Sequence, residues 1–171
     1  MKILNLTLQH LVIILLGVIV FFIDDKELFR AVTTKIILVA IVLFKFFYFL
    51  SHNLKLIRGS QSDKNYFQKF LVSISVNISL IVVSFGVDYF CLYQIDSFAF
   101  NGVPAVAPLY EKICTLIYFS ISTFSTTGFG DIQALTLTGR FLISLEIIMA
   151  FITTVFIISN FVNLKSISTN N

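Results

Sequence analysis

The pattern of hydrophobic positions along the chain predicts four membrane-spanning helices. Apolar stretches with only isolated polar positions run over residues 6–23, 31–50, 70–93 and 141–162. About 20 apolar residues in a helix cross the ~30 Å hydrocarbon layer of a bilayer, so each stretch is long enough to span it. Lipid offers no hydrogen-bond partners to an open backbone. We therefore expect helices even at 73–79, where polar and apolar residues alternate as in a strand.

A fifth apolar stretch, residues 109–124, is too short to cross the membrane and return. It follows a turn-rich segment with Gly102 and Pro104, and Pro108 is well placed to begin a helix. The residues STTGFGD at 125–131 come next, and then the last span. A short helix, an irregular loop and a spanning helix together predict a re-entrant segment. Because irregular backbone inside a membrane is stable only when it is buried in protein or lines water, this loop predicts a pore or a cavity.

Composition agrees with a membrane protein and excludes several classes of function. Of the 171 residues, 57% are hydrophobic and 12% are charged, whereas about a quarter are charged in soluble domains. The net charge is only +3 and basic residues do not cluster, so nucleic acid is not an expected partner. The chain has no nucleophile–base arrangement, phosphate-binding loop or metal-ligand cluster, and we expect neither an enzyme nor a cofactor. Cys91 and Cys114 fit neither a zinc site nor a redox pair; we expect them to be unpaired, with a disulfide between them as the alternative.

The distribution of charge predicts the orientation in the membrane. Four spans place both termini and the 51–69 loop on one side. That side carries six basic residues, against three on the other side once Lys112 and Arg140 in the predicted re-entrant region are set aside. The positive-inside rule then predicts a multi-pass protein of the cell membrane with both termini in the cytoplasm and the 125–131 loop facing out. The first span lacks a small-residue cleavage site and is expected to be a retained signal anchor.

The residues of the loop suit the passage of a cation. Oxygen ligands must replace the water around the ion, and backbone carbonyls do this without a fixed charge that would trap it. To direct successive carbonyls toward one axis, the backbone must alternate between ordinary and left-handed dihedral angles, which glycine adopts at no steric cost. Gly128 and Gly130 are spaced for this alternation, and the Thr126 hydroxyl can add an oxygen at the inner end.

The segment TTGFGD at 126–131 resembles the selectivity-filter signature of potassium channels, which is usually Thr-Val-Gly-Tyr-Gly-Asp. The resemblance extends to the whole of LIYFSISTFSTTGFGDI, which is similar to a pore helix leading into a filter. It also includes TLTGRFLISLEIIMAF, which is similar to the start of the family's inner helix, and so covers roughly residues 105–162. The layout most resembles small prokaryotic ion channels with four spans and one pore loop in each chain.

This resemblance implies an all-α membrane protein with four transmembrane helices, one re-entrant pore helix and a selectivity-filter loop. Residues 1–69 would form two N-terminal transmembrane helices and a cytoplasmic loop, and residues 70–171 would form the pore domain. One chain supplies a quarter of the filter, so the resemblance implies a homotetramer in the lipid bilayer that conducts K⁺ passively. A weakly selective cation channel and a non-conducting regulatory membrane subunit are the alternatives. About nine residues follow the last span, so no domain for a small-molecule ligand is expected.

The resemblance also assigns roles to the residues of the loop. The carbonyls that would coordinate K⁺ are those of Thr126, Thr127, Gly128 and Phe129, with Gly130 completing the filter and Asp131 forming the outer mouth. The side chains of Thr127 and Phe129 would point back toward the pore helix. Thr127 stands where the family usually has valine and Phe129 where it usually has tyrosine. These two differences are expected to alter the stability of the filter more than its selectivity.

Two charged residues lie inside predicted spans, where an ionisable group is a functional candidate. Lys45 lies toward the cytoplasmic half of its helix and is expected to extend its amine to the membrane surface, with a functional role as the alternative. Glu146 lies in the outer half of the last span. It would either make a structural hydrogen bond to pore-helix hydroxyls such as Ser122 or Thr115, or act as a pH-sensitive support behind the filter.

The last span carries further candidate positions toward its cytoplasmic end. Ala150 falls where many relatives have a hinge glycine, and alanine makes the helix stiffer there. Below it, Thr154 and Ile158 are candidate cavity and gate positions. The second span has no basic residue at every third position, so a voltage-sensor helix is not expected.

Overall fold

The computed structural model describes residues 31–57 and 66–169, and the predicted first span, 6–23, lies outside this part of the chain. The described elements are α2 (Ala31–Ile57), α3 (Tyr66–Ile95), β1 (Phe100–Asn101), α4 (Leu109–Phe124), β2 (Gln133–Ala134) and α5 (Leu137–Thr169). The protein is therefore mostly helical, as the hydrophobic pattern predicts.

Three of the described helices are long and apolar enough to cross a membrane. The apolar windows are Val32–Ser51 in α2, Phe70–Ile95 in α3 and Leu137–Ser159 in α5. They confirm the predicted spans at 31–50, 70–93 and 141–162, and the alternating segment 73–79 is helical. The short helix predicted at 109–124 is confirmed as α4, with the same first and last residues.

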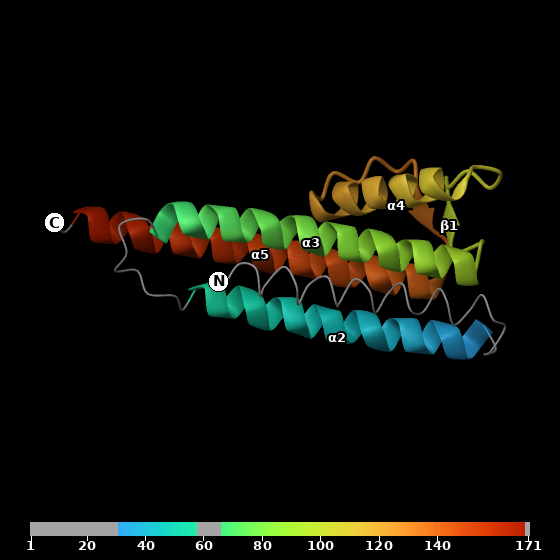
Figure 1. Ribbon diagram of the computed structural model, residues 1–171, viewed down its shortest axis with the longest axis horizontal. Helices are drawn as coiled ribbons and strands as arrows, with labels where there is room; N and C mark the ends of the chain where they lie inside the picture. Colours follow the sequence, from blue (N-terminus) through green and yellow to red (C-terminus); the bar gives the residue numbers. More distant parts are fainter. Residues whose placement is uncertain (1–30, 58–65, 170–171) are drawn as a thin grey trace.

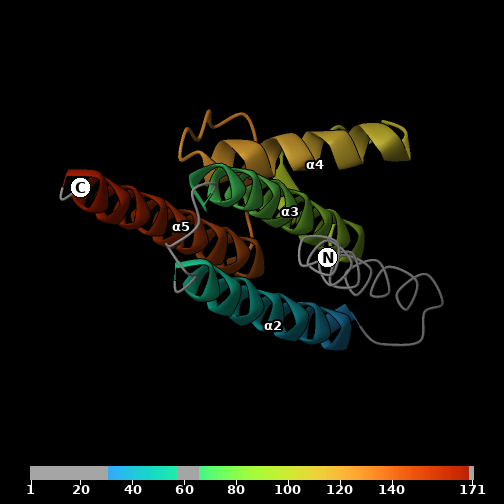
Figure 2. The ribbon, with the colours of Figure 1, turned by 60° about the vertical axis from the view of Figure 1, so that its left-hand side comes forward.

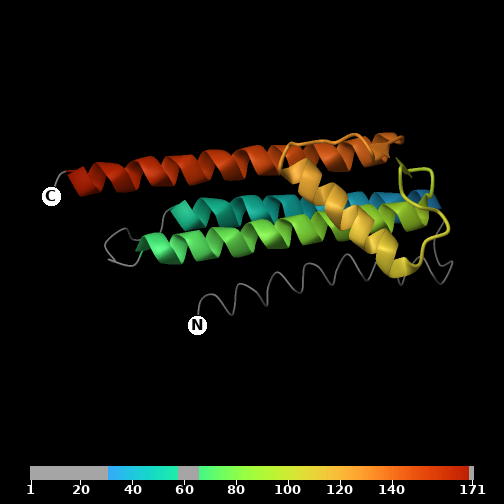
Figure 3. The ribbon, with the colours of Figure 1, turned by 90° about the horizontal axis from the view of Figure 1, so that it is seen from above.

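The three long helices lie side by side, and α4 crosses them obliquely at one end (Figures 1 and 3). Figure 2 shows the same order from another side, with α3 and α5 between α4 and α2. Contacts agree with this view, because α4 packs against α3 and α5 while α2 packs against the same two helices. The arrangement places a short helix and the loop that follows it at one end of a long bundle.

Local sequence explains where α4 begins and how the loop around it is fastened. Pro108 is the N-cap residue of α4, with φ −63°, a value that suits proline at a helix start. The segment before α4 and the segment after the loop pair as antiparallel strands, Phe100 with Ala134 and Asn101 with Gln133. Gly102 has φ +87°, and a Cβ there would lie 2.1 Å from the carbonyl oxygen of Asp131. Only glycine allows the two segments to approach this closely.

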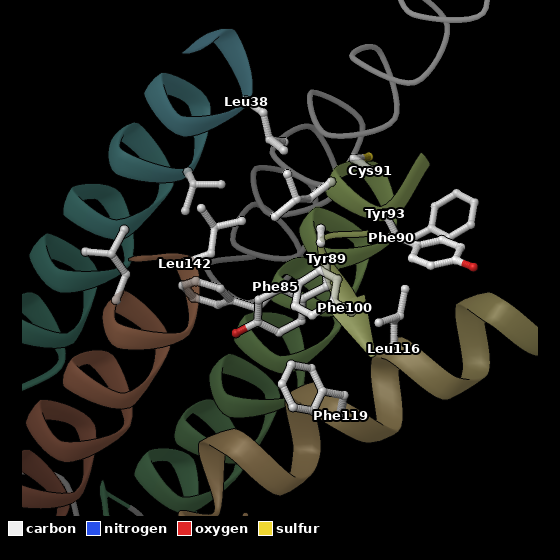
Figure 4. Packing of buried hydrophobic residues seen from close by; sticks show 14 of the residues in the cluster. Leu38, Phe85, Tyr89, Phe90, Cys91, Tyr93, Phe100, Leu116, Phe119 and Leu142 are labelled. Carbon is white, nitrogen blue, oxygen red and sulfur yellow. The ribbon is translucent and has the colours of Figure 1, made fainter. Parts of the chain in front are cut away.

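Aromatic rings from three elements hold α4 on the bundle. Tyr89 of α3 lies 5.5 Å from Phe100 of β1 and 5.3 Å from Phe119 of α4, between ring centroids, and Phe100 and Phe119 are 5.7 Å apart (Figure 4). All three side chains are buried. Each such pair contributes about 0.5–1.5 kcal/mol beyond the area it buries. This packing matters because lipid tails are as apolar as leucine, so van der Waals contact rather than water exclusion associates helices in a membrane.

A buried ion pair joins α2 to α3. The Lys45 Nζ atom lies 2.5 Å from both carboxyl oxygens of Asp88 and 3.0 Å from the Ser84 hydroxyl. The two charged side chains are only 3% and 1% exposed. The prediction that Lys45 extends to the membrane surface is therefore wrong. Its partner lies 43 residues further along the chain, in a different helix, where local sequence gives no indication of it.

A second polar contact joins α2 to both α3 and α5, in buried positions. The Nδ2 atom of Asn77 donates to the side-chain Oδ1 atom of Asn53 at 2.6 Å, and the Nδ2 atom of Asn53 donates to the Thr153 hydroxyl at 3.1 Å. Hydrogen bonds between membrane helices contribute roughly 0.6–2 kcal/mol each. Together with the ion pair, these hydrogen bonds hold α2 against its neighbours at two positions, Lys45 and Asn53.

The end of the bundle near α4 carries a partly exposed ion pair. Lys35 of α2 donates to Asp96, which follows α3, at 2.7 Å, and this hydrogen bond lowers the pKa of Asp96 below its ordinary value. A carboxyl whose pKa falls on folding stabilises the protein at neutral pH, and that contribution is lost as the pH falls toward the lowered value. Because the pair is partly exposed, its contribution is small.

Candidate functional site

The loop after α4 alternates in backbone handedness. Positive φ angles occur at Thr126 (56°), Gly128 (55°) and Gly130 (82°), and at neither of the residues between them. This confirms the alternation expected at the two glycines and extends it to Thr126. Left-handed backbone costs a residue with a side chain roughly 1–2 kcal/mol, so Thr126 is strained. Its amide donates to the Thr123 carbonyl at 2.9 Å, which holds it in place.

The inner end of the loop is bonded to the last turn of α4. The amides of Thr127 and Gly128 both donate to the Ser122 carbonyl, at 3.0 and 3.2 Å. The Thr127 and Ser125 hydroxyls are 2.9 Å apart. The last carbonyls of a helix have no partner within the helix, so the loop satisfies one of them. The backbone of the loop is thus positioned by the end of α4.

The outer end of the loop is held by Tyr118, a side chain of α4. Its hydroxyl donates to Asp131 at 2.9 Å, and its ring stacks on Phe129 with centroids 6.2 Å apart and planes 7° apart. The hydrogen bond to the carboxylate raises the pKa of Tyr118, so the phenol stays protonated and remains a donor. As expected from the sequence, the Phe129 ring lies toward α4. Tyr118 was not predicted from the sequence, although it lies four residues before Ser122 and therefore on the same face of the helix.

The Gly130 carbonyl is already used at the outer end of the loop. It accepts a hydrogen bond from the Gln133 side-chain amide at 3.0 Å. The carbonyls of 126–129 accept no hydrogen bond that involves the described residues. Gly130 therefore belongs with Asp131 at the mouth, whereas the four preceding carbonyls are available as ligands.

Two cavities lie between the loop and α5. One, of about 520 Å³, is lined by Thr126, Gly128 and Gly130 together with Arg140 and Ile147 of α5, among other residues. The other, of about 690 Å³, is lined by the end of α4, by Thr126 of the loop, and by residues of α5 that include the predicted positions Ala150 and Thr154. The structure thus brings Ala150 and Thr154, but not Ile158, to a cavity next to the inner end of the loop.

Glu146 supports α4 from behind. It is fully buried, its Oε1 atom lies 2.5 Å from the Ser120 hydroxyl, and its Oε2 atom accepts a hydrogen bond from Tyr89. A pore-helix hydroxyl was expected as the partner, but Ser122 and Thr115 are the wrong residues. The Ser122 hydroxyl donates within its own helix, to the Phe119 carbonyl at 2.9 Å. Tyr89 was not predicted because it comes from α3, and helix contacts of this kind depend on packing.

The two cysteines, Cys91 and Cys114, are not joined to each other in the structure. Cys91 is buried on α3 and Cys114 is exposed on α4. This agrees with the expectation that no disulfide links them. No group of three or more histidine, cysteine, aspartate or glutamate side chains suitable for a metal ion occurs within the described residues.

Comparison with known proteins identifies the same segment. A family model described as "Ion channel" matches residues 109–165, which begin with α4, contain the loop and continue along most of α5. No curated protein and no solved structure matches the chain significantly. The matched residues include the loop, Tyr118, Ser120 and Glu146, whereas Tyr89 of α3 lies outside the match. Residues 109–165, about a third of the chain, are therefore similar to the pore region of ion channels.

Proposed function

We propose that this protein is a subunit of a potassium-selective channel that conducts K⁺ passively across the cell membrane. The observation that carries the proposal is the alternation of left-handed and ordinary backbone at residues 126–130. Such alternation directs successive carbonyls toward one side of a peptide chain. A row of carbonyls on one side is what replaces the hydration shell of a potassium ion in a filter.

The residues of the loop fit a permeating K⁺ ion. The proposed ligands are the carbonyls of Thr126, Thr127, Gly128 and Phe129, with the Thr126 hydroxyl at the inner end. None of these groups carries a fixed charge, so an ion can bind and leave again. Asp131 adds negative charge at the outer mouth, where it would raise the local cation concentration. The ion is cargo in this proposal, and no cofactor is required.

The proposal requires several copies of the chain, and the resemblance to potassium channels implies four. One loop offers ligands from one side only, whereas an ion must be surrounded. All residues from 125 to 131 are exposed in the single chain, and the two cavities beside them open toward the same loop. Exposed apolar side chains also run along α5, at Phe141, Ile147, Phe151 and Val155. A ring of copies in the bilayer would cover part of this surface.

The orientation and the domain division are part of the same proposal. Both termini would lie in the cytoplasm, residues 1–69 would form two helices and a loop, and residues 70–171 would form the pore domain. The contacts of α2 with α3 and α5 are compatible with this division. They mean that the second helix is packed on the pore domain and not separate from it.

The reversal potential of purified protein in vesicles, with K⁺ on one side and Na⁺ on the other, tests the proposed function. We expect the reversal potential to follow the K⁺ gradient without any added partner. A reversal potential near zero would indicate a weakly selective cation channel. Absence of current would indicate a non-conducting regulatory subunit, and either outcome would contradict the proposal.

Replacing Tyr118 with phenylalanine should shorten the time for which the channel stays conducting. The variant keeps the ring that stacks on Phe129 and removes the hydroxyl that donates to Asp131. Only one of the two contacts between Tyr118 and the loop is therefore lost. Because Tyr118 and Asp131 are exposed in the single chain, solvent weakens this hydrogen bond, and its loss should shorten the lifetime by roughly a few-fold without abolishing conduction. Single-channel recording measures it.

The matched control for this prediction is Tyr110→Phe. Tyr110 is an exposed tyrosine of the same helix, far from the loop in sequence, and the same chemical change there should leave the lifetime as it is. Equal lifetimes for Tyr118→Phe and the unmodified channel would show that the Asp131 contact does not hold the filter.

A further inference from the structure

The buried polar groups behind α4 are unbalanced in charge. Lys45 of α2 and Asp88 of α3 form an ion pair, and Glu146 of α5 has no cationic partner among the described residues. Arg140, six residues before Glu146 on α5, is exposed and donates to the Ala134 carbonyl. Burying an ionised carboxylate without a cation costs several kcal/mol, so the charge count favours a neutral Glu146.

The hydrogen bonds of Ser120 indicate independently that Glu146 is neutral. Its hydroxyl oxygen lies 2.8 Å from the Val82 carbonyl and 2.5 Å from Oε1 of Glu146. A hydroxyl has one proton to donate, and a backbone carbonyl can only accept. If Ser120 donates to Val82, its short contact with Glu146 needs a proton from the carboxyl group. Tyr89 supplies the hydrogen bond to the other carboxyl oxygen, so a neutral Glu146 satisfies every contact.

We propose that Glu146, Tyr89 and Ser120 form a proton-binding site behind the pore loop, in which the neutral carboxyl of Glu146 donates to Ser120 and holds α4 in its conducting position. The effect on conduction rests on the proposed function, whereas the bound proton does not. Among the described residues, the groups that face this site are Asp88 and Tyr89 from α3 and Ser120 from α4. The charge of Asp88 is balanced by its ion pair with Lys45 of α2.

Release of the proton would loosen α4. The carboxyl group would become a carboxylate, the proton would leave to solvent, and Ser120 could then donate either to Val82 of α3 or to Glu146 of α5, but not to both. One of the two hydrogen bonds that join Ser120 of α4 to α3 and α5 would be lost. The Ser122 carbonyl, two residues on, accepts the amides of Thr127 and Gly128, so the loop would lose support. Conduction should therefore fall as the pH rises.

Infrared spectroscopy of the full chain in vesicles tests the bound proton directly. We expect a carboxylic-acid C=O band at neutral pH that disappears at alkaline pH and is absent from Glu146→Gln. Ser120→Ala should shift this band without removing it, because the carboxyl loses its acceptor. Asp96→Asn, at the partly exposed ion pair, is the matched carboxyl control and should leave the band in place. Absence of the band from the unmodified protein, or its persistence in a folded Glu146→Gln protein, would overturn the proposal.

Flux measurements test the consequence for conduction. We expect K⁺ flux of the unmodified channel to fall about fivefold or more from neutral to alkaline pH, which corresponds to the loss of one hydrogen bond of about 1 kcal/mol. In Glu146→Gln the amide donates at either pH, so the ratio of the two fluxes should move to one. An unchanged pH dependence in that variant would overturn the link to conduction. A chain that never conducts would contradict the proposed function instead, and the infrared band would still decide whether the proton is bound.

Discussion

Replacing Gly128 with alanine should abolish K⁺ flux while the protein still inserts and assembles. Gly128 has φ +55°, and within the described part of the single chain no atom beyond the adjacent residues lies within 4 Å of the place where a Cβ would stand. The cost is therefore backbone strain and not collision. It amounts to roughly 1–2 kcal/mol in each chain, and to about 4–8 kcal/mol in a ring of four. Such a cost shifts the equilibrium of the loop away from its conducting form by about three to six orders of magnitude.

Vesicle flux together with size-exclusion chromatography checks this prediction. The matched variant is Thr127→Ala, the neighbouring residue of the same loop, whose φ is not positive. It removes a contact with the Ser125 hydroxyl but adds no backbone strain, so the flux should fall far less than for Gly128→Ala. Equal flux in Gly128→Ala and the unmodified channel would mean that the left-handed backbone at this residue is not needed for conduction.

Features encoded locally could be predicted from the sequence. Both ends of α4 were predicted because Pro108 marks its start and the glycine-containing loop marks its end. The spans in α2, α3 and α5 follow from the length of their apolar stretches. The left-handed backbone at Gly128 and Gly130 follows from the residue type. Each of these properties depends on a few neighbouring residues, so no knowledge of the packing is required.

Features that depend on contacts between helices could not be predicted. Whether Ser120 or Ser122 faces Glu146 depends on how α4 is rotated on α3 and α5, which the sequence of α4 does not reveal. Threonine disfavours left-handed backbone, and Thr126 adopts it together with the hydrogen bond from its amide to the Thr123 carbonyl. The burial of Lys45 depends on a carboxylate in another helix. In each case the decisive partner or orientation comes from the fold.

Replacing Lys45 with methionine should destabilise the protein strongly. The variant leaves Asp88, which is fully buried, without its cation, and breaking a buried ion pair by removing one partner costs about 3–5 kcal/mol. The double variant Lys45→Met/Asp88→Leu should recover most of this loss, because two apolar side chains need no charge balance. The fraction of protein that still elutes at its native position after heating in detergent measures stability for each variant.

The partly exposed ion pair near the N-terminal end of α2 provides the control. Lys35→Met removes the same charge from the same helix, but the pair with Asp96 is partly exposed, so the loss should not exceed about 1 kcal/mol. If Lys45→Met and Lys35→Met lowered the stability equally, or if the double variant were no more stable than Lys45→Met, the buried pair would not be what fastens α2. A strong loss of stability in Lys45→Met, with little loss in Lys35→Met and recovery in the double variant, would show that α2 is part of the structural unit that carries the pore loop. Asp88, the partner of Lys45, directly precedes Tyr89, and Tyr89 contacts both Glu146 and α4.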